Sequence, residues 1–154
     1  MDNTNTNTQE PIFSPDSKGL QQLLAFIKKR AFQDPTRSLN LIDDGLKIAN
    51  RYINPSYSLD LLTFKGGILI QKGLFPHALS IFEEALSIAT RIKDDISLSR
   101  IYNNIGLIYK SPAKYTEALE VFTQSLKYSE SKQNPYIYSN IGAILYIRED
   151  WDKA

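Results

Sequence analysis

The 154-residue chain contains no cysteine, a single histidine and a single tryptophan. Without cysteine it can form no disulfide, no thiol nucleophile and no thiolate metal site. The one histidine, His77, stands between Pro76 and Ala78, where we expect an exposed side chain in the first turn of a helix. A metal site with neither cysteine nor a second histidine is not expected. We therefore expect no metal and no other cofactor.

A large charge of one sign is also lacking. The chain carries 18 basic and 17 acidic side chains, so its net charge is +1. A charge this small gives no global field that would attract nucleic acid or an anionic membrane. No stretch reaches the roughly 18 apolar residues of a membrane span, and the first residues lack the apolar region of a signal peptide. We expect an intracellular, cytoplasmic protein with no nucleic-acid or membrane partner.

Catalytic side chains in a convergent arrangement are missing as well. The neighbouring carboxylates are Glu83 with Glu84 and Asp94 with Asp95. Successive side chains on a helix point about 100° apart, so neither pair converges on one substrate. We expect these pairs to be solvated and the protein not to be an enzyme.

What the chain does have is a repeat of 40 residues. Three series of positions carry it, each shifted by 40 from the one before: Pro35, Ser38, Leu39, Ile42, Gly45, Leu46 and Ala49; Phe75, Ala78, Leu79, Phe82, Ala85, Leu86 and Ala89; Tyr115, Ala118, Leu119, Phe122, Ser125, Leu126 and Ser129. Steps of three and one place each series on one face of an α-helix. Small and large residues alternate along it, which predicts a buried packing face with Phe82 and Phe122 in equivalent core positions.

A second helix precedes each of the later series. Its mark is a glycine 12 residues before an alanine, at Gly66, Gly106 and Gly142. Glycine inside a helix costs about 1 kcal/mol relative to alanine. Its recurrence at one position therefore predicts that a neighbouring helix presses closely against the backbone there.

Taken together, these positions resemble the tetratricopeptide repeat, over roughly residues 17–154. The third repeat supplies Tyr102, Ile105, Gly106, Tyr109, Tyr115, Ala118 and Phe122, with Ser125 where alanine is usual. The second repeat supplies Leu62, Gly66, Leu69, Gly73, Phe75, Ala78, Phe82 and Ala85. It departs from the pattern at Lys65, whose aliphatic stem we expect to pack while its ammonium stays in solvent. The first repeat departs by having Phe26 in the glycine position.

The resemblance implies an all-α protein, a right-handed α-solenoid of antiparallel helix pairs with about three and a half repeats. The glycines are 40 and 36 residues apart, against about 34 in the usual unit, so this is a long-repeat variety. Members of that kind bind proteins or peptides in their inner groove. The resemblance thus implies a protein-binding module, the sensory or scaffolding part of a larger signalling or regulatory protein.

Capping residues and prolines set the expected boundaries. Residues 1–16 are polar and are expected to be a disordered tail, followed by a repeat domain over 17–154. The expected helices are 17–33, 36–52, 57–72, 76–92, 96–111, 115–131 and 136–147, with a further helix beginning near 151.

The last residues match the start of another repeat. Trp151 and Ala154 correspond to the first aromatic residue and the first alanine of the preceding series. We therefore expect the chain to be truncated within its fourth repeat, leaving an apolar face at Tyr138, Ile141 and Leu145. Such a face would be covered by further repeats or by a second copy, giving a homodimer through this repeat.

The candidate binding site follows from the resemblance, in which the position two before the glycine faces a bound peptide. Asn104 and Asn140 hold that position, and side-by-side amides can hydrogen-bond an extended peptide backbone. The alternative is that they bond the adjacent helix or water. The other expected peptide-binding residues of the groove are Asn103, Lys110, Tyr136, Tyr146 and Thr63. A second function also stays open, a structural element that self-associates through its helical edge.

Overall fold

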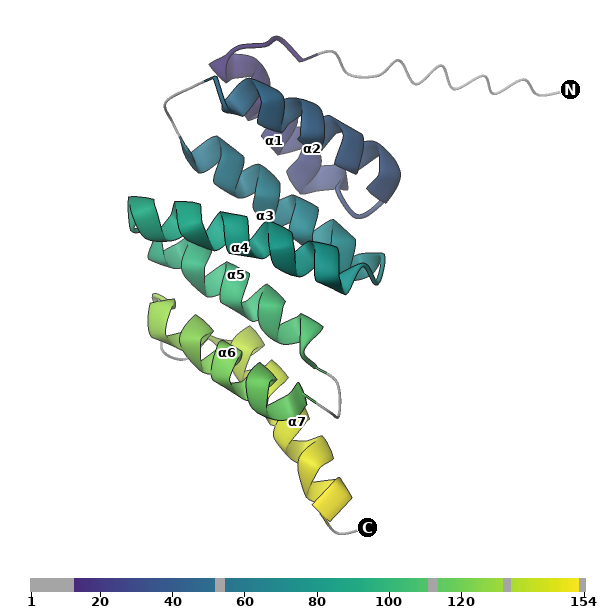
Figure 1. The fold of residues 1–154 in the computed structure, drawn as a ribbon, viewed down its shortest axis with the longest axis vertical. Coiled ribbons are helices and arrows are strands. Elements are labelled where there is room, and N and C mark those ends of the chain that lie inside the picture. Colours follow the sequence, from purple (N-terminus) through teal and green to yellow (C-terminus); the bar gives the residue numbers. More distant parts are fainter. Residues whose placement is uncertain (1–12, 52–54, 111–113, 132–133, 153–154) are drawn as a thin grey trace, which may run out of the picture.

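The computed structural model describes residues 13–51, 55–110, 114–131 and 134–152, the side chains of 148–152 excepted. Seven helices follow one another along this part of the chain and pack antiparallel in sequence order, as expected of a tetratricopeptide-like array. They are α1 (Ser17–Arg30), α2 (Pro35–Ala49), α3 (Pro55–Gln71), α4 (Phe75–Ile92), α5 (Asp95–Ile108), α6 (Tyr115–Tyr128) and α7 (Pro135–Asp152). The stack is elongated, with α1 and α2 at one end and α7 at the other (Figure 1).

The helices begin within two residues of the expected positions because local chemistry decides their starts. The carboxylate of Asp16 caps α1 by accepting from the backbone N–H of Gly19 at 2.7 Å. Asp34 caps α2 by accepting from the N–H of Arg37 at 3.1 Å, and Pro35 supplies the first helical residue. Residues 1–12 and Ala154, both part of the expectations above, lie outside the described residues.

The ends of the helices differ more from expectation. Four helices stop about one turn early: α1 ends at Arg30, α2 at Ala49, α5 at Ile108 and α6 at Tyr128. The opposite happens in α7, which is continuous to Asp152, so the expected new helix near Trp151 is wrong. No proline or glycine lies between positions 147 and 151, and the backbone therefore has no local reason to leave the helix.

The repeated glycines and phenylalanines form pairs in the core. Phe82 and Phe122 are completely buried, as expected. A Cβ atom on Gly66 would lie 2.4 Å from the Phe82 ring, and one on Gly106 would lie 2.6 Å from the Phe122 ring. The close approach predicted at these two glycines is confirmed. In each case the contacting group is an aromatic ring 16 residues further along the chain.

The third glycine is different. No described atom lies within 4 Å of the position that a Cβ on Gly142 would take, and the residue is exposed. The close approach expected at this glycine is therefore not seen among the described residues. The exposed side chains of Tyr138 and Leu145 lie on the same face of α7, in line with the apolar surface expected there. Ile141 is half-buried in the cluster around Phe122.

Lys65 also departs from its expected role. Its ammonium nitrogen lies 2.7 Å from Oδ1 of Asp43 on α2, and the lysine side chain is 23% exposed. The sequence did not predict this ion pair, which forms because α2 brings a carboxylate within reach of the ammonium.

Candidate functional site

A groove runs between the N-terminal halves of α5 and α7, beside the end of α6. It consists of two adjoining pockets of about 240 and 220 Å³. The first is lined by Ser99, Arg100, Asn103, Asn104, Asn134, Tyr136 and Ile137, and the second by Ile96, Ser99, Arg100, Ser129, Glu130, Ser131 and Asn134. Because Ser99, Arg100 and Asn134 belong to both, we treat the two pockets as one α5–α7 groove.

Helix geometry explains why α5 supplies one wall. Its groove residues are spaced three and four apart, so they share one face. The helix is fixed at its start by Asp94, which accepts from the N–H of Ser97 at 3.0 Å and from its hydroxyl at 2.8 Å. The other wall begins at Asn134, whose side chain accepts from the N–H of Tyr136 at 3.1 Å. Both walls thus start from capped helix ends.

An amide pair bridges the two helices. Nδ2 of Asn140 donates to Oδ1 of Asn103 at 3.1 Å. Asn140 therefore bonds the neighbouring helix, which is the alternative that the sequence analysis left open for it. Its partner on that helix is Asn103, whereas the sequence analysis paired it with Asn104. Asn104 is half-buried, and within the described part of the chain its amide has no hydrogen-bond partner. A half-buried amide without a partner is available to a ligand.

The groove also contains a cation that sequence reasoning missed. Arg100 is exposed, and no carboxylate of the described residues forms an ion pair with it. Its position four residues before Asn104 puts both on one helical face, which is a signal the sequence did contain. Exposed apolar surface flanks it, since Ile96 is 51% and Tyr136 is 80% exposed.

Four of the expected site residues do not line this groove, and one of them is Asn140, which bonds Asn103. Thr63 is buried, and its hydroxyl donates to the Leu59 carbonyl at 2.8 Å within α3. Lys110 lies just beyond the opposite end of α5. Tyr146 is exposed on α7, ten residues or about 15 Å along the helix from Tyr136. The structure brings together Asn103, Asn104 and Tyr136, with Asn140 held behind them.

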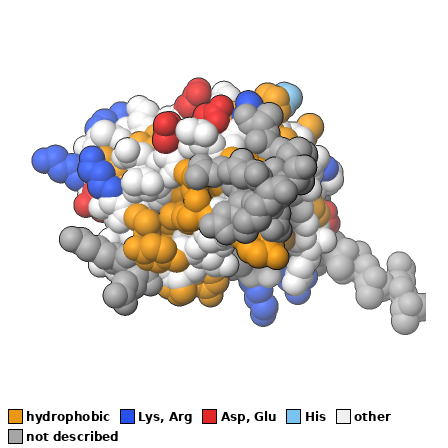
Figure 2. Space-filling view, turned by 90° about the horizontal axis from the view of Figure 1, so that it is seen from below, with side chains coloured by type: hydrophobic (Ala, Val, Ile, Leu, Met, Phe, Trp, Pro, Cys, Tyr) orange, Lys and Arg blue, Asp and Glu red, His pale blue; other side chains and the backbone are white. Residues whose placement is uncertain are grey.

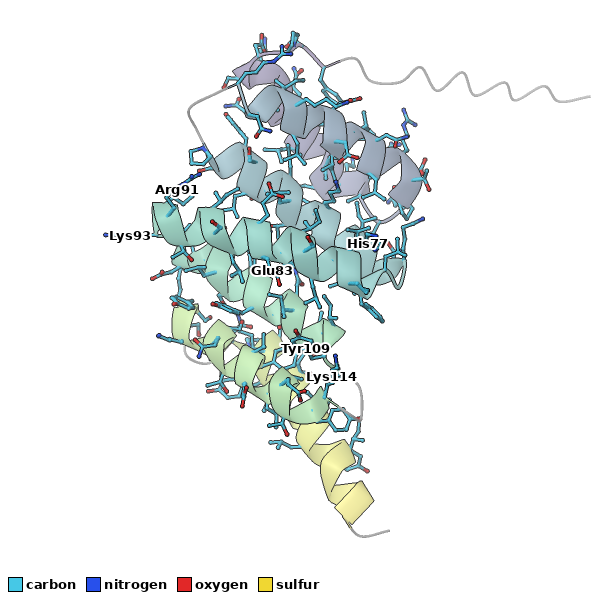
Figure 3. All side chains as sticks on the ribbon, viewed as in Figure 1. His77, Glu83, Arg91, Lys93, Tyr109 and Lys114 are labelled. Carbon is cyan, nitrogen blue, oxygen red and sulfur yellow. The ribbon has the colours of Figure 1, made fainter. Side chains whose placement is uncertain are left out.

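The described residues hold neither a cluster of metal ligands nor a membrane-spanning helix. They contain no group of three or more histidine, aspartate or glutamate side chains able to hold a metal ion. His77 is exposed in the first turn of α4, as expected, with Glu83 further along that helix (Figure 3). None of the helices in the described ranges has both the length and the apolar character needed to cross a membrane.

Comparison with known proteins agrees with the repeat. Residues 57–131 match the family model described as tetratricopeptide repeat, which covers nearly all of α3 and the whole of α4 to α6. No curated protein is similar enough to the chain to be counted as a relative. Domains of this family are generally protein-interaction modules and typically non-catalytic. The resemblance to the tetratricopeptide repeat is therefore shown for residues 57–131.

Proposed function

We propose that this protein is a non-catalytic module that binds an extended peptide segment of a protein partner in the α5–α7 groove. The observation that carries the proposal is the half-buried amide of Asn104, which has no partner in the described structure and lies beside a hydrogen-bonded pair of amides. An asparagine amide has both a donor and an acceptor, which suits the alternating N–H and C=O groups of an extended backbone.

The remaining groove residues supply the other requirements of peptide binding. The bond from Asn140 to Asn103 holds those two amides in place, so fewer rotamers need to be ordered when the ligand arrives. Arg100 provides an unpaired guanidinium for an acidic ligand side chain. Ile96 and Tyr136 offer apolar surface for its neighbours. A module of this kind suits the sensory or scaffolding part of a larger signalling or regulatory protein.

The test starts from a displayed library of extended peptides selected on the whole chain. The affinity of a selected peptide is then measured by isothermal titration for the wild type, Asn104→Ala and Arg100→Gln. We expect each substitution to weaken binding about tenfold, equivalent to about 1.4 kcal/mol. Asn40→Ala, at an exposed asparagine of α2, is the matched control and should bind as the wild type does. Unchanged affinity in a folded Asn104→Ala variant would place the site elsewhere.

A second function is favoured by the open face of α7. The space above Gly142 is empty of described atoms, while Tyr138 and Leu145 beside it are 50% and 41% exposed. Hydrophobic side chains form patches on the surface seen from this end of the array (Figure 2). We propose as the alternative that this face binds a second copy of the chain. Sedimentation over a wide concentration range would show a dimer that Leu145→Lys abolishes, and a monomer at every concentration would contradict it.

A further inference from the structure

At the opposite end of the array lies a second pocket, between α1 and α2. Its volume is about 180 Å³, and it is lined by Phe26, Arg30, Gln33, Asp34, Arg37 and Ser38. None of these residues belongs to the α5–α7 groove, and we call it the α1–α2 pocket. Phe26, at its centre, stands where later repeats have glycine.

Two guanidinium groups are gathered around one aromatic ring in this pocket. The Cζ atoms of Arg30 and Arg37 lie 5.7 and 6.0 Å from the centroid of the Phe26 ring. Phe13 packs edge-on against the same ring at 6.1 Å and helps to fix it. Each guanidinium is therefore within cation–π distance of the Phe26 ring.

Neither arginine forms an ion pair with a carboxylate of the described residues. Within that part of the chain, Nε of Arg37 is also the buried side-chain nitrogen that lacks a hydrogen-bond partner. A buried donor without an acceptor is uncommon in folded proteins, because its lost hydration is not replaced. Together these features give the pocket guanidinium donors that suit an anionic acceptor.

The acid in the pocket wall does not fill that role. Oδ1 of Asp34 accepts from the backbone N–H of Arg37 at 3.1 Å, and this bond caps α2. The lining residues therefore carry two positive charges and one negative charge, a net charge of +1. The pocket retains an excess of unpaired guanidinium donors.

We propose that the α1–α2 pocket binds a carboxylate group, either on an acidic side chain of a protein partner or on a free carboxylic acid. The planar guanidinium fork matches the two oxygens of a carboxylate. The Phe26 ring provides an apolar surface for the methylene groups next to it, and the Gln33 amide adds a donor at the wall.

Nuclear magnetic resonance of the arginine Nε–Hε groups tests this on the whole chain. N-acetylglutamate methylamide is titrated at constant ionic strength, and the uncharged N-acetylglutamine methylamide is the matched control ligand. We expect saturable shifts of the Arg30 and Arg37 signals with the glutamate compound and none with the glutamine compound. The signal of Arg91, which is exposed on α4 and lines neither site, serves as the internal control. Arg37→Lys keeps the charge but loses the fork, and we expect it to weaken binding about tenfold.

Two further ligands, glutarate and inorganic phosphate, distinguish a free carboxylic acid from an acidic side chain and a carboxylate from another anion. Glutarate that saturates the site at lower concentration than the peptide-like compound identifies a free carboxylic acid as the ligand, and the reverse identifies an acidic side chain. Tighter binding of inorganic phosphate overturns the carboxylate assignment. Linear drift of all arginine signals together overturns the site itself. If Arg37→Lys does not fold, Arg30→Gln replaces it, while Arg91→Gln on α4 must leave the shifts unchanged.

Discussion

The ring of Phe122 occupies the space that a side chain on Gly106 would need. A Cβ built on this glycine lies 2.6 Å from Cε1 of the ring, far inside ordinary contact distance. Phe82 stands in the same relation to Gly66 at 2.4 Å. The second and third repeats thus each join their two helices by fitting a large ring against bare backbone, so the glycine and the phenylalanine must be considered together.

Gly106→Ala should therefore destabilise the protein, although alanine favours helix. We expect a loss of about 1–3 kcal/mol in the free energy of unfolding, because the buried Phe122 ring has to move. Gly142→Ala is the matched control, since its Cβ would meet no described atom, and it should stabilise α7 by about 0.5–1 kcal/mol. Urea denaturation compares the two. Equal effects at both glycines would contradict the role of the ring.

Phe122→Ala and Phe82→Ala should each cost about 3–5 kcal/mol, since both rings are fully buried. Phe32→Ala, at a side chain that is 52% exposed, is the control and should cost much less. Thermal and chemical unfolding report the differences. A loss below about 1 kcal/mol at either buried ring would show that the repeats are aligned in the wrong register.

Ser99 and Ser125 join α5 to α6 by reciprocal bonds, in which each hydroxyl donates to the other residue's carbonyl at 2.8 and 2.7 Å. Either serine changed to alanine should cost about 1 kcal/mol. The double variant should lose less stability than the sum of the two single variants, because each single substitution already disturbs the hydrogen bonds of the other serine. A double-mutant cycle in urea measures the coupling, and strict additivity would argue against it.

Lys93 ends α4 in the left-handed conformation, with φ 57° and ψ 43°, just past the helix (Figure 3). Glycine adopts this conformation without the steric penalty of a Cβ. Lys93→Gly should raise the free energy of unfolding by about 1 kcal/mol. Lys93→Ala keeps the Cβ, so its melting temperature should stay close to that of the wild type. If the glycine variant melts at a lower temperature than the alanine variant, the left-handed conformation of Lys93 does not strain the backbone.

The start of α1 should be sensitive to acid. The N–H of Gly19, and then the hydroxyl of Ser14, donate to the Asp16 carboxylate and lower its pKa below the ordinary value. Such a group stabilises the helix start above its unfolded pKa, and the effect is lost as the pH falls through the lower folded pKa. A carboxyl-detected titration by nuclear magnetic resonance should show this, with the Gly19 amide shift following the same curve. In Asp16→Asn, whose side chain caps without titrating, that curve should be flat.

The candidate site was only partly accessible from the sequence. The resemblance placed Asn103, Asn104 and Tyr136 in a groove, and the structure places all three in its lining. The resemblance did not identify Arg100 as a groove residue. It also did not predict that Asn140 would bond Asn103 in particular. Those facts depend on how far α7 is shifted and rotated against α5, and residue offsets along one helix do not fix that relation between two helices.

The sequence by itself determined the repeat, the seven helices and most of their starts, because helical periodicity, capping residues and prolines act within a few neighbouring residues. It also determined which faces are buried, through the repeated spacing of small and large residues such as Ala118 and Phe122. Tertiary structure alone decided that Lys65 meets Asp43, that no described atom approaches Gly142 and that two arginines lie over the Phe26 ring. Each of these depends on which side chains neighbouring helices bring within a few ångströms, and that is settled only when the helices pack.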